Sequence, residues 1–188
     1  MNTHKSSSAQ GTQSKWSSFT NLASWALLII LFSYVLYQQA PLYYQNFQKR
    51  NQQLPSLNLV HMLTGDDFSF PLEGPSLVVF WASNCPPCLL EMGRLKSAVE
   101  AGKLPGQRIL AINPYEPPAV IHEFLRSSPH PFQFLDDRGA LTRVMQVRAT
   151  PTFVWLDGGR IHKVTTGVHI IGHFELERFL NYEQDASI

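Results

Sequence analysis

The chain has 188 residues, of which 44% are hydrophobic and 15% are charged, which is enough for one packed domain with additional segments. Its formal net charge of +1 argues against a general nucleic-acid-binding protein, because such proteins carry a clear excess of basic side chains. The charge is unevenly distributed: four basic residues precede Asp66, which is the first acidic residue. The first third of the chain therefore differs from the rest in charge, because it carries basic residues and no acidic ones.

A polar tail and an apolar segment open the chain. Residues 1–20 are rich in Ser, Gln and Thr without an apolar period, which indicates a polar N-terminal tail. Residues 21–38 contain no charged side chain, and we expect them to form a transmembrane anchor, although the length is near the lower end of the ~17–25 residues that a spanning helix needs. The flanking Tyr37, Tyr43 and Tyr44 suit the membrane interface. The alternative is a buried helix of a soluble protein.

The apolar segment does not resemble a cleaved signal peptide. The small residue that follows it, Ala40, is preceded by Gln38 where a second small residue should stand and is followed by Pro41. We therefore expect an uncleaved anchor followed by a linker over residues 39–53. Two basic residues flank each side of the anchor, so the positive-inside rule does not set its orientation.

A globular pattern covers residues 54–183 and leaves a short tail at 184–188. Strands are predicted, from apolar runs and turn signals, at 57–63, 68–72, 76–82, 108–113, 132–137, 152–156 and 161–166. Helices are predicted, from apolar periodicity and proline starts, at 86–101, 117–128, 140–147 and 171–181. Strands that alternate with helices and end in a hairpin and a helix indicate an α/β fold around one central mixed sheet.

The two cysteines of the chain, Cys85 and Cys88, are separated only by Pro86 and Pro87. A disulfide between them closes too short a loop to constrain the unfolded chain appreciably. Cys85 follows a buried strand and precedes a helix, where unpaired N–H groups and the helix dipole stabilise a thiolate. Cys88 lies one turn deeper. We therefore predict a bond that forms and breaks, with Cys85 as the attacking residue and Cys88 as the resolving one.

Three other uses of the cysteine pair are weaker. A structural zinc site needs about four ligands, and the chain has no second cysteine pair. A copper(I) site on two thiolates is chemically reasonable, because soft ligands select that ion. A purely structural disulfide is disfavoured by the short loop. Thiol-disulfide exchange needs no cofactor other than the cysteines themselves, and no metal is expected.

Two stretches of sequence resemble a known family. The segments LVVFWASNCPPCLLEM at 77–92 and ATPTFVWLDGGRI at 149–161 are similar to those of the membrane-anchored thioredoxin-like disulfide reductases of the TlpA/ResA type, which include the cytochrome c maturation branch. The likeness covers about residues 54–183. It implies a thioredoxin-like fold in which the region between the two stretches supplies the extra strand and helix of a TlpA-type insertion.

The resemblance also implies roles for residues around the cysteines. It implies a cis bond between Thr150 and Pro151, packed against the cysteines, with backbone groups of Thr150 holding a substrate chain. Glu91 matches a buried acid that tunes or relays protons for Cys88, although a solvated glutamate is an alternative reading. The full set of expected substrate-binding residues is Trp81, Asn84, Pro86, Pro87, Thr150 and Pro151. For Trp81, simple core packing is an equally good alternative.

Two positions depart from the pattern of these proteins. Val79 stands where thioredoxin itself has a buried aspartate, so that acid is missing. Asn84 stands where the family usually has a tryptophan, which removes an aromatic contact beside Cys85 and leaves partner choice open.

The resulting functional hypothesis is a membrane-anchored thiol-disulfide oxidoreductase that reduces disulfides of extracytoplasmic proteins, with apocytochrome c as a candidate substrate. An integral-membrane thiol donor would re-reduce it. The catalytic domain is expected in the periplasm, anchored in a bacterial inner membrane, because a cytosolic face would duplicate soluble thioredoxin. The alternatives are a dithiol oxidase or isomerase, and a copper(I)-handling module.

Overall fold

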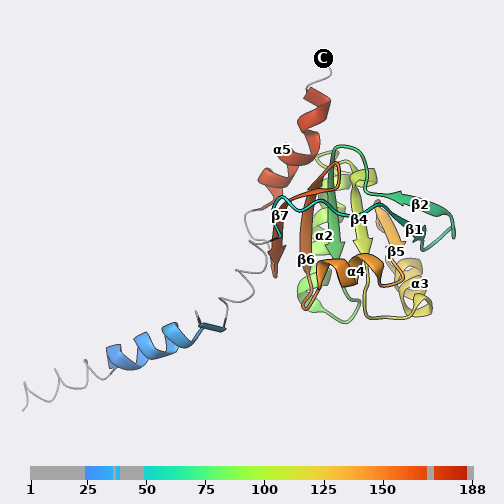
Figure 1. Cartoon of the computed structure of the whole chain (residues 1–188). Helices are drawn as coiled ribbons and strands as arrows, with labels where there is room; N and C mark the ends of the chain where they lie inside the picture. The colour runs from blue at the N-terminus through green and yellow to red at the C-terminus, as the bar shows by residue number, and fades with distance from the viewer. Residues whose placement is uncertain (1–23, 36, 39–48, 169–171, 186–188) are drawn as a thin grey trace, which may run out of the picture. The chain divides into compact units, whose positions relative to one another are not determined.

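The structure, a computed structural model, describes residues 24–35, 37–38, 49–168 and 172–185. The chain divides into two compact units, Met1–Gln45 and Asn46–Ile188 (Figure 1). In the first unit, residues 24–35 and 37–38 are helical and exposed. Within the described residues, no helix is both long and apolar enough to cross a membrane.

Several expected segments lie partly or wholly outside the described residues. They are the polar tail at 1–20, residues 21–23 and 36 of the expected anchor, most of the linker and the last three residues of the chain.

A seven-stranded sheet forms the centre of the second unit, with the strand order β2-β1-β5-β4-β3-β6-β7. Its strands are β1 (Leu57–His61), β2 (Asp67–Phe70), β3 (Pro75–Phe80), β4 (Ile109–Ile112), β5 (Gln133–Asp136), β6 (Thr152–Asp157) and β7 (Arg160–Thr166). The strands β3, β4 and β5 are parallel, whereas β1, β2, β6 and β7 join by antiparallel pairings. The predicted mixed sheet is confirmed.

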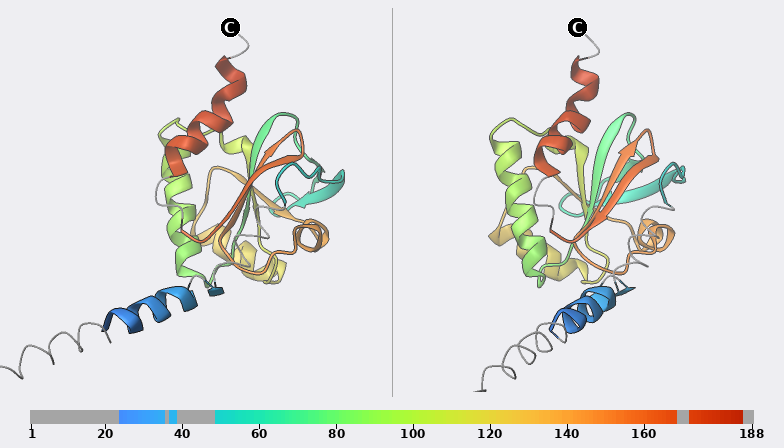
Figure 2. Two further views of the ribbon diagram at one scale, coloured as in Figure 1. Left: turned by 60° about the vertical axis from the view of Figure 1, so that its left-hand side comes forward. Right: turned by 90° about the vertical axis from the view of Figure 1, so that its left-hand side faces the viewer.

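Helices cover both faces of this sheet (Figure 2). They are α2 (Pro86–Glu100), α3 (Pro118–Ser127), α4 (Ala140–Met145) and α5 (Gly172–Asp185), and a short 3-10 turn, η1 (Gly106–Arg108), precedes β4. Buried side chains of α2, α3 and α5 pack on one face, and those of α4 pack on the other.

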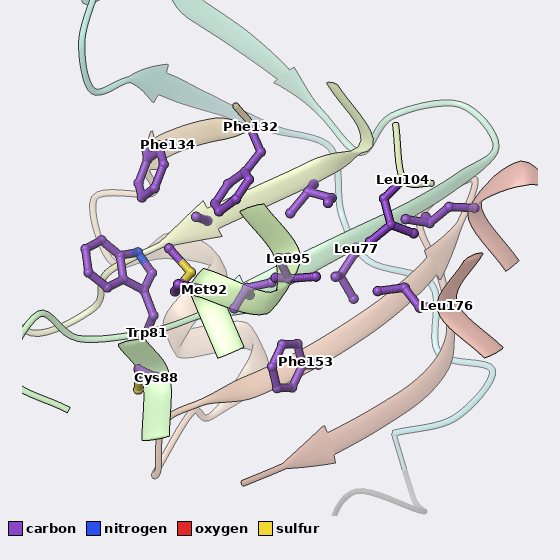
Figure 3. Packing of buried hydrophobic residues seen from close by; sticks show 14 of the residues in the cluster. Leu77, Trp81, Cys88, Met92, Leu95, Leu104, Phe132, Phe134, Phe153 and Leu176 are labelled. Carbon is purple, nitrogen blue, oxygen red and sulfur yellow. The ribbon is translucent and has the colours of Figure 1, made fainter. Parts of the chain in front are cut away.

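The alternation of side chains along the central strands produces the two cores. On β3, Leu77 and Val79 face the layer of α2, α3 and α5, whereas Val78 and Phe80 face α4. All four are fully buried, as expected for a central strand that is covered on both sides. Figure 3 shows the first of these cores, in which the side chains of α2 lie against the sheet close to Cys88.

The region between the two family-like stretches contributes α3 and β5, and β5 lies between β4 and β1 in the sheet. A helix and a strand therefore occur where the resemblance implied them.

The folded unit also includes residues that the sequence analysis places in the linker. Asn51 N–H donates to Ile161 O at 2.7 Å, and Ile161 N–H donates to Gln52 O at 2.9 Å, so this segment pairs with the β6–β7 hairpin.

Candidate active site

The cysteine pair lies where the buried strand β3 gives way to helix α2. Cys85 is the N-cap residue of α2, with extended backbone angles, and Pro86 and Pro87 occupy the first helical positions. The Cys88 N–H donates to the Cys85 sulfur at 3.3 Å. The two cysteines are joined by a disulfide, with their Cα atoms 5.2 Å apart. In the reduced form, the same N–H would stabilise negative charge on the Cys85 sulfur.

Access to the two sulfur atoms is unequal. Cys85 is half-buried, whereas Cys88 has 0% of its surface exposed and belongs to the core shown in Figure 3. The neighbouring Asn84, Pro86 and Pro87 are exposed. A partner from solution can therefore reach the Cys85 sulfur but not the Cys88 sulfur while the disulfide is closed.

The Thr150–Pro151 segment lies against the cysteines although it is distant in the sequence. Its peptide bond is cis, as the resemblance implied. The Thr150 carbonyl oxygen is 3.7 Å from the Cys85 sulfur. The sheet register explains the meeting, because Thr152 at the start of β6 pairs with Phe80 at the end of β3. The Pro151 side chain is buried, and Thr150 is half-buried.

Glu91 is a buried acid one helical turn beyond Cys88. Only 2% of its surface is exposed, and its carboxylate pairs with the Arg94 guanidinium at 2.7 Å. Residues three apart on a helix are neighbours on its surface, so Glu91 lies on the same side of α2 as Cys88. The burial of Glu91 excludes the alternative of a solvated glutamate. The Arg94 partner was not anticipated from the sequence.

Trp81 has a different place from the one expected of a substrate-binding residue. Its side chain is 0% exposed, and its ring lies on the same side of the sheet as Phe134 (Figure 3). The ring centre is 4.8 Å from that of Phe124 and 5.6 Å from that of Phe134. This burial agrees with the core-packing alternative for Trp81 rather than with direct contact to substrate, because the alternation along β3 turns the ring into the core. Val79 faces the same core and keeps it apolar beside Cys88.

Three polar residues beside the cysteines were missed by the sequence analysis. Glu116, in the loop between β4 and α3, accepts hydrogen bonds from the backbone N–H of Ser83 at 2.7 Å and from the Ser83 hydroxyl. The side-chain amide of Asn113 also donates to Glu116. One signal was available in the sequence: Asn113 directly follows a buried strand, which favours a side-chain-to-backbone turn, and Glu116 lies three residues later within that turn.

These hydrogen bonds affect the ionisation of Glu116. Partial burial opposes the charged form, but the bonds from the Ser83 hydroxyl, the Ser83 backbone and the Asn113 amide together hold the pKa of Glu116 below its ordinary value of 4.5. Glu116 is therefore a carboxylate at neutral pH.

Comparison with known proteins agrees with this geometry. Residues 51–165 match the AhpC/TSA family. The chain is 25% identical over 126 residues to sporulation thiol-disulfide oxidoreductase A of Bacillus subtilis. The matched region covers 64% of this chain and 76% of that protein. It is 31% identical over 99 residues to thiol-disulfide oxidoreductase ResA of Halalkalibacterium halodurans, covering 51% of this chain and 56% of that protein.

Solved structures share the fold. The crystal structure of StoA from Bacillus subtilis matches with a TM-score of 0.58 at 24% identity, over 68% of this chain and 98% of that one. The solution structure of a putative thioredoxin from Neisseria meningitidis matches with a TM-score of 0.58 at 25% identity, over 71% of this chain and 92% of that one. The thioredoxin-like fold and the resemblance seen in the sequence are confirmed. The chain belongs to the AhpC/TSA family, and its thioredoxin-like domain is that of a thiol-disulfide oxidoreductase of the StoA and ResA type.

Proposed function

We propose that this protein is a disulfide reductase in which Cys85 attacks and Cys88 resolves. The observation that carries the proposal is the unequal access to the two sulfur atoms: Cys85 is half-buried at the start of α2, and Cys88 is closed to solvent. Only the outer sulfur can meet a folded or extended protein partner, and only the inner one is held within the domain to complete the exchange.

The cycle conserves atoms and electrons. The Cys85 thiolate attacks one sulfur of a substrate disulfide, and the other substrate sulfur leaves as a thiolate that takes up a proton. The Cys88 thiolate then attacks the Cys85 sulfur and releases the second substrate thiol. The substrate gains two electrons and two protons, and the protein is left with its Cys85–Cys88 disulfide. A thiol donor in the membrane then reduces that disulfide by the reverse sequence.

Residues around the sulfur atoms have supporting roles in this proposal. The exposed Asn84, Pro86 and Pro87 form part of the surface that meets the substrate. Backbone groups of Thr150 hold the substrate chain beside Cys85, and Pro151 shapes that segment. Glu91 accepts the proton of the Cys88 thiol as that residue becomes a nucleophile.

Location and substrate form the outer part of the proposal. The absence of charge over residues 21–38 supports a membrane anchor, with the catalytic domain on the periplasmic side of a bacterial inner membrane. The substrates are disulfide-containing extracytoplasmic proteins, with apocytochrome c as a candidate. The cysteine pair is the only redox group that the cycle uses.

The redox state of Cys85 and Cys88 in cells tests the direction of the reaction. Cells are quenched rapidly with acid, and free thiols are alkylated with a mass-tagging reagent. A mainly dithiol population in an oxidising compartment is expected, because a dedicated donor would keep a reductase reduced. A mainly disulfide population would contradict a reductase and favour a dithiol oxidase.

Trapping in the same cells identifies the substrates. In Cys88→Ser, the mixed disulfide on Cys85 has no resolving thiol, so substrate proteins remain covalently attached. The proposal predicts extracytoplasmic proteins with cysteine pairs among those captured, and none on Cys85→Ser. Capture on Cys85→Ser, through Cys88 instead, would reverse the assigned roles.

A further inference from the structure

The loop that follows β4 holds Glu116 against the active-site loop, which is the segment between β3 and α2. The Asn113 side-chain oxygen accepts hydrogen bonds from the backbone N–H groups of Tyr115 at 3.1 Å and Glu116 at 3.0 Å. This is the side-chain-to-backbone turn that Asn favours. The turn places the Glu116 carboxylate against Ser83, a residue 33 positions earlier in the chain.

The contacts of the Glu116 carboxylate are donors. One oxygen accepts from the Ser83 backbone N–H and from the Asn113 amide, and the other accepts from the Ser83 hydroxyl. Hydrogen bonds to an ionised carboxylate are shorter and stronger than neutral ones. An uncharged amide at this position would turn a donor toward one of the same donors, so the arrangement favours a carboxylate in particular.

We propose that Glu116 is a positioning residue for Cys85: it ties the active-site loop to the end of β4, and its fixed negative charge opposes formation of the Cys85 thiolate. Ser83 is two residues from Cys85, which limits the distance between their Cα atoms to about 7 Å. The Glu116 carboxylate is held on Ser83, so its charge lies in the neighbourhood of Cys85, and a nearby like charge disfavours the ionised thiol. It acts against the helix N-terminus, which favours the thiolate.

Other charged groups on the surrounding segments do not duplicate this effect. On α2, Glu91 and Arg94 form an ion pair, so their charges largely offset each other. Before Pro151, Arg148 is exposed and lies near enough to Lys49 to help lower the pKa of that amine, after the larger effect of burial. Glu116, by contrast, accepts a hydrogen bond directly from the active-site loop, at the backbone N–H of Ser83.

The consequence concerns the direction of exchange. A pair whose outer thiolate is strongly stabilised is oxidising, because its reduced form is favoured. A charge that opposes that thiolate makes the dithiol a better reductant. The inference thus deepens the proposed function, and it depends on Cys85 being the outer, reacting sulfur.

The pH dependence of Cys85 alkylation tests this inference. The full chain carrying Cys88→Ser presents a single thiol, whose rate of reaction with iodoacetamide is measured from about pH 4 to pH 10. In that background, Glu116→Gln should lower the midpoint of the profile by about half a pH unit or more. Should that variant unfold, Glu116→Ser removes the same charge, and the same fall is expected.

Control variants separate charge from structure. Glu116→Asp and Ser83→Ala keep the negative charge, and both should leave the midpoint within about 0.2 units of the parent. Glu123→Gln removes an exposed acid on α3 that pairs with Arg126, and it should also leave the midpoint in place. An unchanged or raised midpoint in folded Glu116→Gln would overturn the inference. The alkylation needs no substrate protein, so its outcome is independent of whether the chain reduces disulfides in cells.

Discussion

At the scale of single residues, the cysteine pair works because two equivalent side chains are placed in unequal surroundings. Cys85 caps α2 and accepts the Cys88 N–H, whereas Cys88 lies in an apolar core that contains Val79 where thioredoxin has an acid. A buried thiol resists ionisation, because its thiolate loses hydration. A nearby proton acceptor is then needed, and Glu91 is the buried carboxylate on the same side of the helix.

Glu91→Gln is expected to slow the resolving step. If Glu91 accepts the Cys88 proton, its loss should lower steady-state disulfide reduction by about 100-fold, while the first attack by Cys85 continues. The mixed disulfide should therefore accumulate, as measured by non-reducing mass spectrometry of quenched reactions. Glu100→Gln, an exposed acid on the same helix, is the matched control and should behave as the parent. Equal turnover in both variants would remove Glu91 from the mechanism.

At the scale of elements, α2 is held on the sheet by one face. Leu95 is 1% exposed within the core, whereas Leu89 on the same helix is 40% exposed. Leu95→Ala should lower the free energy of unfolding by about 2–5 kcal/mol, because it leaves a cavity. Leu89→Ala should change it by about 0.5 kcal/mol or less. Urea unfolding followed by fluorescence measures both, and equal losses would contradict the packing of this helix.

The segment between α3 and β5 adds a pH-dependent contribution. His130 stacks on Phe124 and lies edge-on to Phe132 and Phe134, and its Nδ1–H donates to the Ser128 carbonyl at 2.7 Å. Burial lowers the pKa of His130 below 6.5; the Ser128 bond opposes this effect, and two nearby charges of opposite sign add smaller opposing effects.

The sign of the resulting pH dependence follows from linkage. Below pH 6.5, His130 of the unfolded chain binds a proton that His130 of the folded chain does not. The stability that the neutral imidazole contributes above pH 6.5 is therefore lost as the pH falls through the lower pKa of the folded state. His130→Phe keeps the aromatic packing without titrating. The Tm of the parent should therefore fall relative to the Tm of the variant as the pH is lowered from 7.5 to 5. A difference that is constant with pH would contradict the burial of the neutral imidazole.

At the scale of the whole molecule, the segment that leads into the domain protects an edge of the sheet. Residues 51–54 bond to the β6–β7 hairpin, and Gln53 forms an isolated bridge with Arg160 of β7. An uncovered edge strand presents unpaired N–H and C=O groups to other chains. The segment before the thioredoxin-like domain is thus part of its fold, and the hairpin is covered where the sheet would otherwise end.

Local patterns predicted much of this molecule. The apolar runs located all seven strands, because burial on one or both faces leaves a period that short segments retain. The cysteine spacing indicated the exchange chemistry, because a strand followed by a helix creates a specific position for the first thiol. The cis bond before Pro151 came from the resemblance, since an X-Pro bond in a folded protein has only about a 5–6% chance of being cis.

Contacts between distant segments were beyond these patterns. The bonds between Ser83 and Glu116 join residues 33 positions apart, and they depend on β3 and β4 lying side by side in one register. The burial of Trp81 agrees with the predicted strand at 76–82, although β3 itself ends at Phe80: the chain continues along the sheet, with the Trp81 N–H donating to Ile112 O at 3.0 Å. The side chain therefore keeps the alternation and turns inward.

The most direct test of the central claim is the catalysed reduction of insulin disulfides, with dithiothreitol as the donor, by the full chain and by its two single-cysteine variants. The account predicts turnover by the parent chain and no turnover at the parent rate by Cys85→Ser or Cys88→Ser. When dithiothreitol is left out, one equivalent of mixed disulfide should form on the reduced Cys88→Ser chain and none on Cys85→Ser. Turnover at the parent rate by either variant would contradict exchange through the Cys85–Cys88 pair.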